Sequence, residues 1–251
     1  MLRIALGERF PSLRSFVFCL EDSIAESSVR AALINLEAVL GRPRLMDRLP
    51  AERPTMFVRP RNVEMLRLIS KMSGADLIDG YEILKVTTQN LQLYLAALPT
   101  RRQYILPTIE SREAFEPREM RSLRELLLVV QERVLAIRIG GNDLLQTLNA
   151  KRSNRRTAYD GPLGHVVASL ISLFVPWGFS MSAPVFEDYQ DAGLLAEEVE
   201  RDIEHGLLTK SAIHPAQVDV IQDAYRVSRP EYEKALAIAR NNAPAVFAKD
   251  G

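Results

Sequence analysis

The stretch VLAIRIGGNDLL, residues 134–145, runs from an apolar segment through two glycines to an asparagine, an aspartate and two leucines. An apolar run closed by paired glycines is typical of a buried strand that stops abruptly. The run has no polar alternation, which favours a parallel sheet covered by helices on its faces over an antiparallel sheet with one wet face. The acid directly after the glycines, Asp143, is the first candidate functional residue.

Similar apolar runs recur along the whole chain and alternate with amphipathic patterns of helical period, expected at residues 25–40, 63–72, 87–98, 120–134, 163–175 and 192–205. Strand and helix patterns alternate without a linker or a repeat, which predicts one α/β domain. The strand candidates lie at residues 2–6, 15–21, 55–60, 80–86, 103–110, 134–141, 179–185 and 206–213.

Eight strand candidates in a chain of this length favour a single (β/α)8 TIM barrel, with a doubly wound open sheet as the alternative. Residues 7–14 are too few for a crossover helix between two parallel strands, so we expect a shortened first βα unit. We expect the barrel to span residues 1–228. Residues 229–251 are expected to form a C-terminal helix and tail that pack on the barrel or on a neighbouring subunit.

The composition limits the classes of partner. Lys and Arg balance Asp and Glu at 32 each in 251 residues, so no strongly basic nucleic-acid surface is expected. The single cysteine, Cys19, allows neither an internal disulfide nor a multi-cysteine metal site. The longest apolar run, residues 166–179, is shorter than a bilayer requires, and no secretory signal is evident. We therefore expect a cytoplasmic protein without a nucleic-acid or membrane partner.

Charged residues follow the strand candidates, at the end where a parallel barrel carries its active site. Helix caps explain part of this pattern. They explain Glu110 and Asp143 less well, because two converging carboxylates need a cation or a shared proton. A hard divalent ion that binds one or two carboxylates, such as Mg²⁺, fits them. Gly140 and Gly141 would let ion and substrate approach the strand end.

The loop at residues 151–157, KRSNRRT, carries four basic residues after Asp143. It is either a solvated loop or a site that meets phosphates or carboxylates. It lacks interleaved aromatic residues, so single-stranded nucleic acid is a poor candidate. The glycines at 140 and 141 lack the spacing of a dinucleotide fingerprint, and no P-loop is present.

Six segments together resemble the citrate lyase β-subunit-like, or HpcH/HpaI-type, carbon–carbon lyases, which are Mg-dependent TIM barrels. The resemblance runs in order along nearly the whole chain and is strongest to a branch often encoded near tellurium-resistance genes. The segments are CLEDSIAESSVRAAL (19–33), FVRPRN (57–62), ILKV (83–86), PTIES (107–111), RIGGNDLL (138–145) and GLLTKSAIHPAQV (206–218).

The resemblance implies roles for individual residues. Glu110 and Asp143 match the two carboxylate ligands of the family's magnesium, and Arg59 matches an arginine that binds a substrate carboxylate or carbonyl. Glu21 and Asp22 match an acidic pair near the reacting carbon. The matching segments also imply a catalytic Lys85 and further substrate-binding positions at Gly140, Gly141, Asn142, Lys210 and His214. A helix-cap role for His214 stays open.

The implied reaction is retro-aldol or Claisen-type cleavage of a small oxo- or hydroxy-acid, or its acyl thioester, through a metal-stabilised enolate. The alternatives are a non-catalytic ligand-binding barrel, or a thioester hydrolase or synthase that uses the same site. Leu84 and Thr209 stand where the family has a proline and a glycine. The short first unit removes ground where many members contact coenzyme A, so its use stays open. The family usually forms homo-oligomers, and we expect one here.

Overall fold

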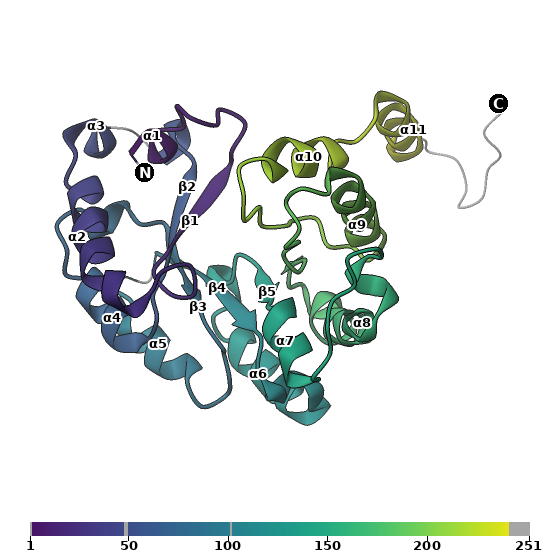
Figure 1. Ribbon diagram of the computed structural model, residues 1–251, viewed down its shortest axis with the longest axis horizontal. Coiled ribbons are helices and arrows are strands. Elements are labelled where there is room, and N and C mark those ends of the chain that lie inside the picture. Colours follow the sequence, from purple (N-terminus) through teal and green to yellow (C-terminus); the bar gives the residue numbers. More distant parts are fainter. Residues whose placement is uncertain (1, 48–49, 101, 241–251) are drawn as a thin grey trace.

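The computed structural model describes residues 2–47, 50–100 and 102–240. Its centre is one sheet in which neighbouring strands are all parallel and follow the order of the chain. Helices cover the outside of this curled sheet (Figure 1). The strands are β1 Ser15–Cys19, β2 Thr55–Arg59, β3 Gly80–Ile83, β4 Tyr104–Ile109, β5 Ile137–Ile139 and β6 Met181–Ser182.

The helices fall between the strands, as the alternating sequence pattern predicts, and all six expected helical segments are present. Their bounds are α1 Leu2–Ala5, α2 Val29–Leu40, α3 Pro43–Met46, α4 Val63–Ile69, α5 Leu91–Ala97, α6 Pro117–Leu128, α7 Gly141–Thr147, α8 Pro162–Phe174, α9 Ala192–Glu204, α10 Gln217–Ala224 and α11 Arg229–Ala239.

The expected closed barrel of eight strands is confirmed only as a curled, six-stranded half-barrel. A seventh position exists as an isolated parallel bridge between Ala183 and Lys210, in place of the strand expected over residues 206–213. Opposite the sheet, the side chain of Gln222 donates to the carbonyl of Ser12 at 2.8 Å and links α10 to the segment before β1. This contact brings α10 back to the segment before β1, while the sheet itself stays open between β6 and β1.

The strand expected at residues 2–6 is wrong, because the structure has helix α1 there. Ala5 and Leu6 are buried in the main hydrophobic core, and Gly7 turns the chain in the left-handed region at φ 72°. This result removes the problem of residues 7–14, which are too few for a crossover but need only connect a helix to β1.

The two faces of the sheet carry different cores. Large apolar side chains such as Val58, Tyr81 and Ile105 pack with the helices in the main cluster. The opposite, inward face has a small separate cluster of Phe57, Leu106 and Ala136, with Val17 packed against it. Because side chains alternate between faces, residues two positions further along these strands also point inward. The inward cluster thus forms a floor below the carboxyl ends of the strands.

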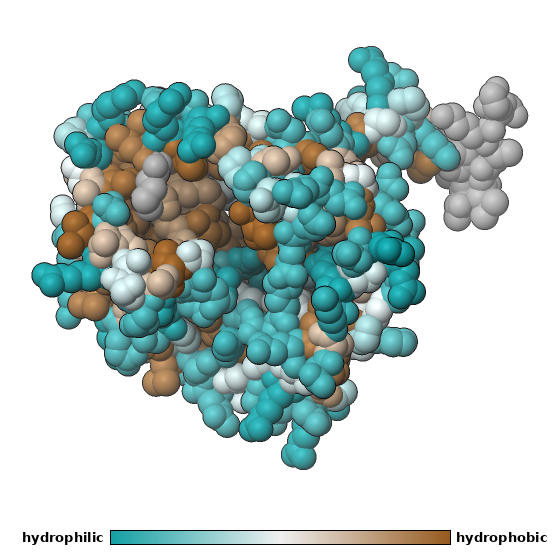
Figure 2. All heavy atoms as spheres, viewed as in Figure 1, coloured by the Kyte–Doolittle hydropathy of each residue, from teal (hydrophilic) through white to brown (hydrophobic). Residues whose placement is uncertain are grey.

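The C-terminal helix α11 has no buried residue and lies at the edge of the molecule (Figure 1). Figure 2 shows apolar residues gathered on the side of the N-terminal elements, while the side of α8 and α9 is mostly hydrophilic. Within the residues that the structure describes, no helix combines the length and apolar composition needed to cross a membrane. The expected tail at residues 241–251 lies outside the described residues.

Candidate active site

Arg59, the last residue of β2, lies among four carboxylates at the inward end of the sheet. Its Nη2 atom is 2.8 Å from Oε2 of Glu21, 3.3 Å from Oδ2 of Asp22 and 3.9 Å from Oε2 of Glu110. Its Nη1 atom is 3.7 Å from Oε1 of Glu82. The carboxyl ends of β1 to β4 thus converge on one guanidinium, as parallel strands in a curled sheet require.

The loop that carries the acidic pair after β1 is held by Arg61, two residues beyond Arg59. The Nε atom of Arg61 donates to the carbonyl of Leu20 at 2.9 Å, and Nη2 donates to that of Ile24 at 2.6 Å. Its guanidinium also pairs with Glu26. A planar group with five donors suits such a multiple backbone contact. Arg61 therefore fixes the loop while Arg59 meets the side chains that the loop presents.

Lys85 connects the two predicted metal ligands. Its backbone N–H donates to Oε1 of Glu110 at 3.0 Å, and its Nζ lies 3.7 Å from Oδ1 of Asp143. Lys85 has φ 44°, in the left-handed region that non-glycine residues rarely adopt. Such strained positions are frequent at functional sites. The structure thus places Glu110 and Asp143 around the same residue, although Glu110 directly follows β4 and Asp143 lies in α7.

Gly140 is required by the close approach of Glu110. A methyl group at this position would lie 2.3 Å from Cβ of Glu110 and 2.6 Å from its Oε2, closer than any real contact allows. At Gly141 a methyl group would meet Leu163 and Pro184 at 2.9 Å each. The paired glycines therefore allow the side chain of Glu110 to lie directly against the backbone at the end of β5, where any larger residue would clash with it.

Burial changes the acid–base behaviour of the cluster. Desolvation raises the pKa of Glu110 to about 7, against the opposing effect of the Lys85 backbone donor and Arg59, while Asp143 raises it further. Desolvation likewise raises the pKa of Glu21. Burial alone would lower the pKa of Arg59, but the charges of Glu82 and Glu110 outweigh it and keep the guanidinium cationic. Strongly perturbed carboxyls in a cleft are typical of active sites.

Two charged residues that sequence reasoning missed lie below the cluster, in the interior of the half-barrel. Glu82 of β3 is fully buried, accepts a hydrogen bond from Thr108 Oγ1 at 3.1 Å and pairs with Arg138 of β5. Their signal was the charge itself, since Glu82 and Arg138 interrupt otherwise apolar runs. Without the direction of each side chain, those charges could equally have faced a helix.

The charges of the site suit a divalent cation. Five carboxylates against three cations give the cluster a formal charge of −2, since 3 minus 5 is −2. The described residues contain no group of three or more His, Cys, Asp or Glu side chains placed to hold a metal. Mg²⁺ needs only one or two carboxylates and takes its other oxygens from water or substrate. The charged set comprises Glu21, Asp22, Glu82, Glu110, Asp143, Arg59, Lys85 and Arg138.

Lys210 is not brought to this cluster. Its side chain is fully buried and points toward α9, with Nζ 2.9 Å from Oε1 of Glu198 and 3.0 Å from Oδ2 of Asp202. Arg152 also pairs with Glu198, and Tyr159 donates to Asp202. Two of the three ammonium donors of Lys210 are taken by buried carboxylates, and its side chain has no exposed surface through which a substrate could reach it. The contacts of Lys210 are those of a structural ion cluster.

The structure also gives the other predicted substrate-binding side chains different partners. Asn142 donates through Nδ2 to Oε1 of Glu187 at 2.7 Å. His214 stacks on Tyr189 with ring centroids 4.2 Å apart, and its Nδ1 accepts from the backbone of Ala216. His214 therefore makes local contacts in the turn before α10, whose N-cap is Ala216 without a side-chain cap bond, and Asn142 stays beside Gly141 at the strand end.

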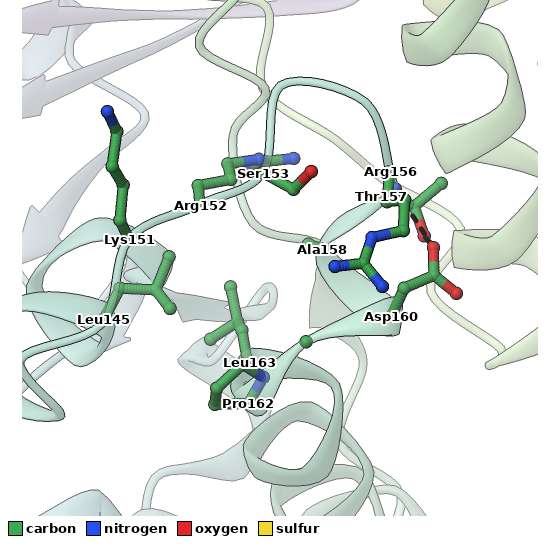
Figure 3. Close-up of a pocket in the computed structure, with 11 residues that line it drawn as sticks. Leu145, Lys151, Arg152, Ser153, Arg156, Thr157, Ala158, Asp160, Pro162 and Leu163 are labelled. Carbon is green, nitrogen blue, oxygen red and sulfur yellow. Dashed lines mark hydrogen bonds between the residues drawn. The ribbon is translucent and has the colours of Figure 1, made fainter.

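The basic loop forms one wall of a small cavity next to the site (Figure 3). The cavity has a volume of about 100 Å³ and is also lined by Leu163, the residue that approaches Gly141. In the close-up, Lys151 and Arg156 do not point at a common centre. Arg152 is already committed to Glu198 and to the carbonyl of Val185. The cavity therefore does not present a converging set of free cations.

The chain was compared with family models, with curated proteins and with solved structures. The model of the C–C bond lyases of the TIM-barrel fold matches residues 1–251. The chain belongs to this family. The resemblance to citrate-lyase-like carbon–carbon lyases is thereby confirmed. A comparison with curated proteins gives no match for the lyase.

Solved structures of similar fold include RipC from Yersinia pestis, with a TM-score of 0.68, 18% identity and coverage of 86% of this chain and 90% of that one. Another is the protein CitE from Mycobacterium tuberculosis in complex with magnesium, acetoacetate and coenzyme A (TM-score 0.66, 22% identity, 94% and 82% covered). A third is the citrate lyase β subunit from M. tuberculosis with oxaloacetate and magnesium (TM-score 0.62, 20% identity, 90% and 93% covered). At these identities the likeness shows the shared fold.

Proposed function

We propose that the protein is a Mg²⁺-dependent carbon–carbon bond lyase that acts on a small oxo- or hydroxy-acid by a retro-aldol or Claisen-type step. The observation that carries the proposal is the placement of Glu110 and Asp143 on either side of Lys85, beside an arginine ringed by acids. Membership of the C–C bond lyase family supports the reaction class, and the geometry supports which residues perform it.

Glu110 and Asp143 would hold Mg²⁺, whose chemistry when bound is to polarise a carbonyl and stabilise an enolate as a Lewis acid. The donor set fits this ion, because it offers two carboxylates in a cluster with a formal charge of −2 and leaves positions for substrate oxygens. Gly140 keeps the space beside Glu110 free of a side chain. Structures of similar fold contain magnesium together with acetoacetate or oxaloacetate, which supports the proposal that Mg²⁺ and a small oxo-acid bind together here.

Arg59 would bind the carboxylate of the acid. Its outer contacts, with Glu21 and with the exposed carboxylate of Asp22, are the ones that an arriving anion can replace. A guanidinium and a carboxylate form a bidentate pair that fixes orientation as well as charge. The substrate would then lie between Arg59 and the ends of β4 and β5.

Glu21 is the candidate proton-transfer group. Burial raises the pKa of its carboxyl above the ordinary value, which makes the carboxylate a stronger base. In the cleavage of a hydroxy-acid, Glu21 would take the hydroxyl proton as the carbon–carbon bond breaks. The electron pair of that bond enters the enolate fragment, and the enolate carbon then accepts the proton from Glu21, which returns to its carboxylate form. The backbone N–H of Asp22 donates to Oε2 of Glu21 at 3.0 Å, and this contact would keep Glu21 in place after the anion has replaced the acids on Arg59.

The expected homo-oligomer is also a proposal. Helix α11 exposes Tyr232 and Ile238 and buries none of its residues, as a helix that packs on a neighbouring subunit would in an isolated chain. Light scattering at several protein concentrations, with the whole chain and with a chain ended after residue 228, tests this proposal. The same number of subunits per particle before and after truncation would contradict it.

The metal assignment is tested by calorimetry of Mg²⁺ binding to Asp143→Asn, with Asp76→Asn as the matched control. Asp76 is exposed and lies before β3, at the opposite end of the sheet. We expect Asp143→Asn to weaken Mg²⁺ binding by about tenfold or more, and the control to match the unaltered protein. Equal affinities for all three proteins would refute the assignment.

The reaction class is tested by incubating the protein with a panel of small oxo-acids, hydroxy-acids and their coenzyme A thioesters. Mass spectrometry with and without Mg²⁺ detects cleavage as paired fragments whose masses sum to the substrate. Product formation that depends on Mg²⁺ and is lost in Arg59→Met would support the proposal. Hydrolysis of thioesters without carbon–carbon cleavage would instead favour a hydrolase on the same site.

A further inference from the structure

A fully buried carboxylate stands between two arginines in the interior of the half-barrel. Glu82 lies 3.7 Å from Nη1 of Arg59 through its Oε1 atom, and its Oε2 atom pairs with Nη1 of Arg138. Thr108 donates to Oε1 of Glu82 at 3.1 Å and fixes its orientation. All four side chains belong to the inward face, above the apolar floor formed by Phe57 and its neighbours.

The acids around Arg59 differ in exposure. Asp22 has 67% of its side chain exposed and Glu21 15%, whereas the side chain of Glu82 has no exposed surface. An anion that enters from solvent can displace the two acids of the β1 loop. It cannot displace Glu82, which approaches Arg59 from below. Glu110 is also buried, at 3.9 Å from Arg59, but as a proposed metal ligand it would share its charge with Mg²⁺. Glu82 is therefore the buried partner that stays with Arg59 and sets the position of its guanidinium.

A permanent carboxylate partner would by itself neutralise Arg59 and weaken its attraction for an anion. Arg138 prevents this, because it supplies a second positive charge to the same carboxylate. The unit of two arginines and one buried glutamate has a formal charge of +1. Buried charges interact strongly over such distances, since little water screens them. The free positive charge then remains on the side of Arg59 that faces the incoming ligand.

We infer that Glu82 and Arg138 are positioning residues that hold Arg59 in place and keep its charge available for the anionic group of the substrate. This inference rests on the proposed function only in taking Arg59 as the residue that binds the anion. Neither Glu82 nor Arg138 touches the ligand, and Arg138 acts through Glu82. A purely structural ion pair would stabilise the barrel interior without any effect that passes from Arg138 to Arg59.

A double-mutant cycle separates these two roles. The variants are Arg138→Met, Glu82→Gln and the two together, with Arg138→Lys as the charge-conserving control. Pyruvate is the probe, titrated by calorimetry in saturating Mg²⁺, and Mg²⁺ alone is titrated separately. Far-UV circular dichroism and urea unfolding report whether each variant folds. If Arg138→Met fails to fold, Glu82→Gln and the double variant still compare proteins with and without the charge at position 138, and a loss of about tenfold between them would overturn the inference.

We expect Arg138→Met to weaken pyruvate binding about tenfold, because uncompensated Glu82 then neutralises Arg59. Arg138→Lys should recover most of the affinity. In the Glu82→Gln background the same change at Arg138 should alter pyruvate affinity by less than about twofold, since there is no charge left to compensate. Mg²⁺ affinity should stay close to that of the unaltered protein throughout.

Unchanged pyruvate affinity in Arg138→Met, or an equal loss in both backgrounds, would overturn the inference and leave a structural ion pair. The proposed function fails in a different way. If the unaltered protein binds Mg²⁺ but not pyruvate, Arg59 is not the binding residue for an oxo-acid anion and the inference falls with that assignment. If it does not bind Mg²⁺, the roles of Glu110 and Asp143 are wrong, and pyruvate titration without Mg²⁺ still decides the role of Arg138.

Discussion

Glu110→Gln should make the metal-free protein more stable at alkaline pH. Burial raises the pKa of this carboxyl from 4.5 to about 7, so ionising it opposes folding. The opposition begins above pH 4.5, where the unfolded chain ionises, grows until about pH 7, where the folded protein ionises, and is constant above that. A shift of this size corresponds to about 3 kcal/mol. Glutamine removes the charge but leaves an oxygen to accept from the backbone of Lys85.

The hydrogen bond from Lys85 is one of the contributions to this pKa shift, so the exchange of a charged acceptor for a neutral one is already counted. We therefore expect a gain of about 3 kcal/mol in the free energy of unfolding at pH 8 for Glu110→Gln, and no gain at pH 4.5. Urea unfolding in EDTA at the two pH values measures the difference. Glu37→Gln, an exposed position on α2, is the control and should show no gain at either pH.

Mg²⁺ should remove or reverse the difference in stability between the unaltered protein and Glu110→Gln. A ligand that binds only the folded protein adds about 2.7 kcal/mol at a hundred times its dissociation constant. The unaltered protein would gain this stability and Glu110→Gln would not, so the gap at pH 8 should close or change sign. A Glu110→Gln variant that is less stable than the unaltered protein in EDTA at pH 8 would refute the reasoning. The same conclusion would follow if the gap were equal at pH 4.5 and pH 8.

Two further substitutions test the packing of the site and of its surroundings. Gly140→Ala should lower the free energy of unfolding by about 1–3 kcal/mol and weaken Mg²⁺ binding, because the new methyl group displaces Glu110. Urea unfolding measures the first effect and calorimetry the second. Gly161→Ala, where a methyl group would have no atom within 4 Å, is the control. Lys210→Met should lower the free energy of unfolding by about 3–5 kcal/mol, because two buried carboxylates on α9 lose their shared cation. Mg²⁺ affinity should be unchanged in that variant; a weakened affinity with unchanged stability would place Lys210 in the site after all.

Much of the site could be predicted from the strand ends. Arg59, Glu21 and Glu110 directly follow or close apolar runs, and parallel strands bring such positions together whatever the details of the helices. Gly140 and Gly141 indicated that another group lies close to the backbone at this strand end, because glycine has no side chain to prevent it. A cation near Glu110 could be expected from the sequence, because converging carboxylates at strand ends need a countercharge nearby.

Other contacts of the site depended on the face of the sheet to which each side chain points, and an apolar run does not encode that face. When both faces of a strand are buried, the sequence shows no alternation that separates the inward face from the outward face. Glu82 and Arg138 could therefore have faced a helix, and Lys210 could have faced the interior. Residues 2–6 are too few to show a period, so the apolar run fits a strand as well as the helix that forms there.

The sequence by itself determined the α/β alternation, the parallel sheet and the polar residues at its carboxyl end, because these depend on local patterns of burial and on glycine positions. Only the tertiary structure decided which charges meet. Side chains in a strand alternate with a period of two, so a change of one residue in phase moves a group to the other face. That phase, set by how the strands pair, placed Arg138 beside Glu82 in the interior and turned Lys210 away toward α9.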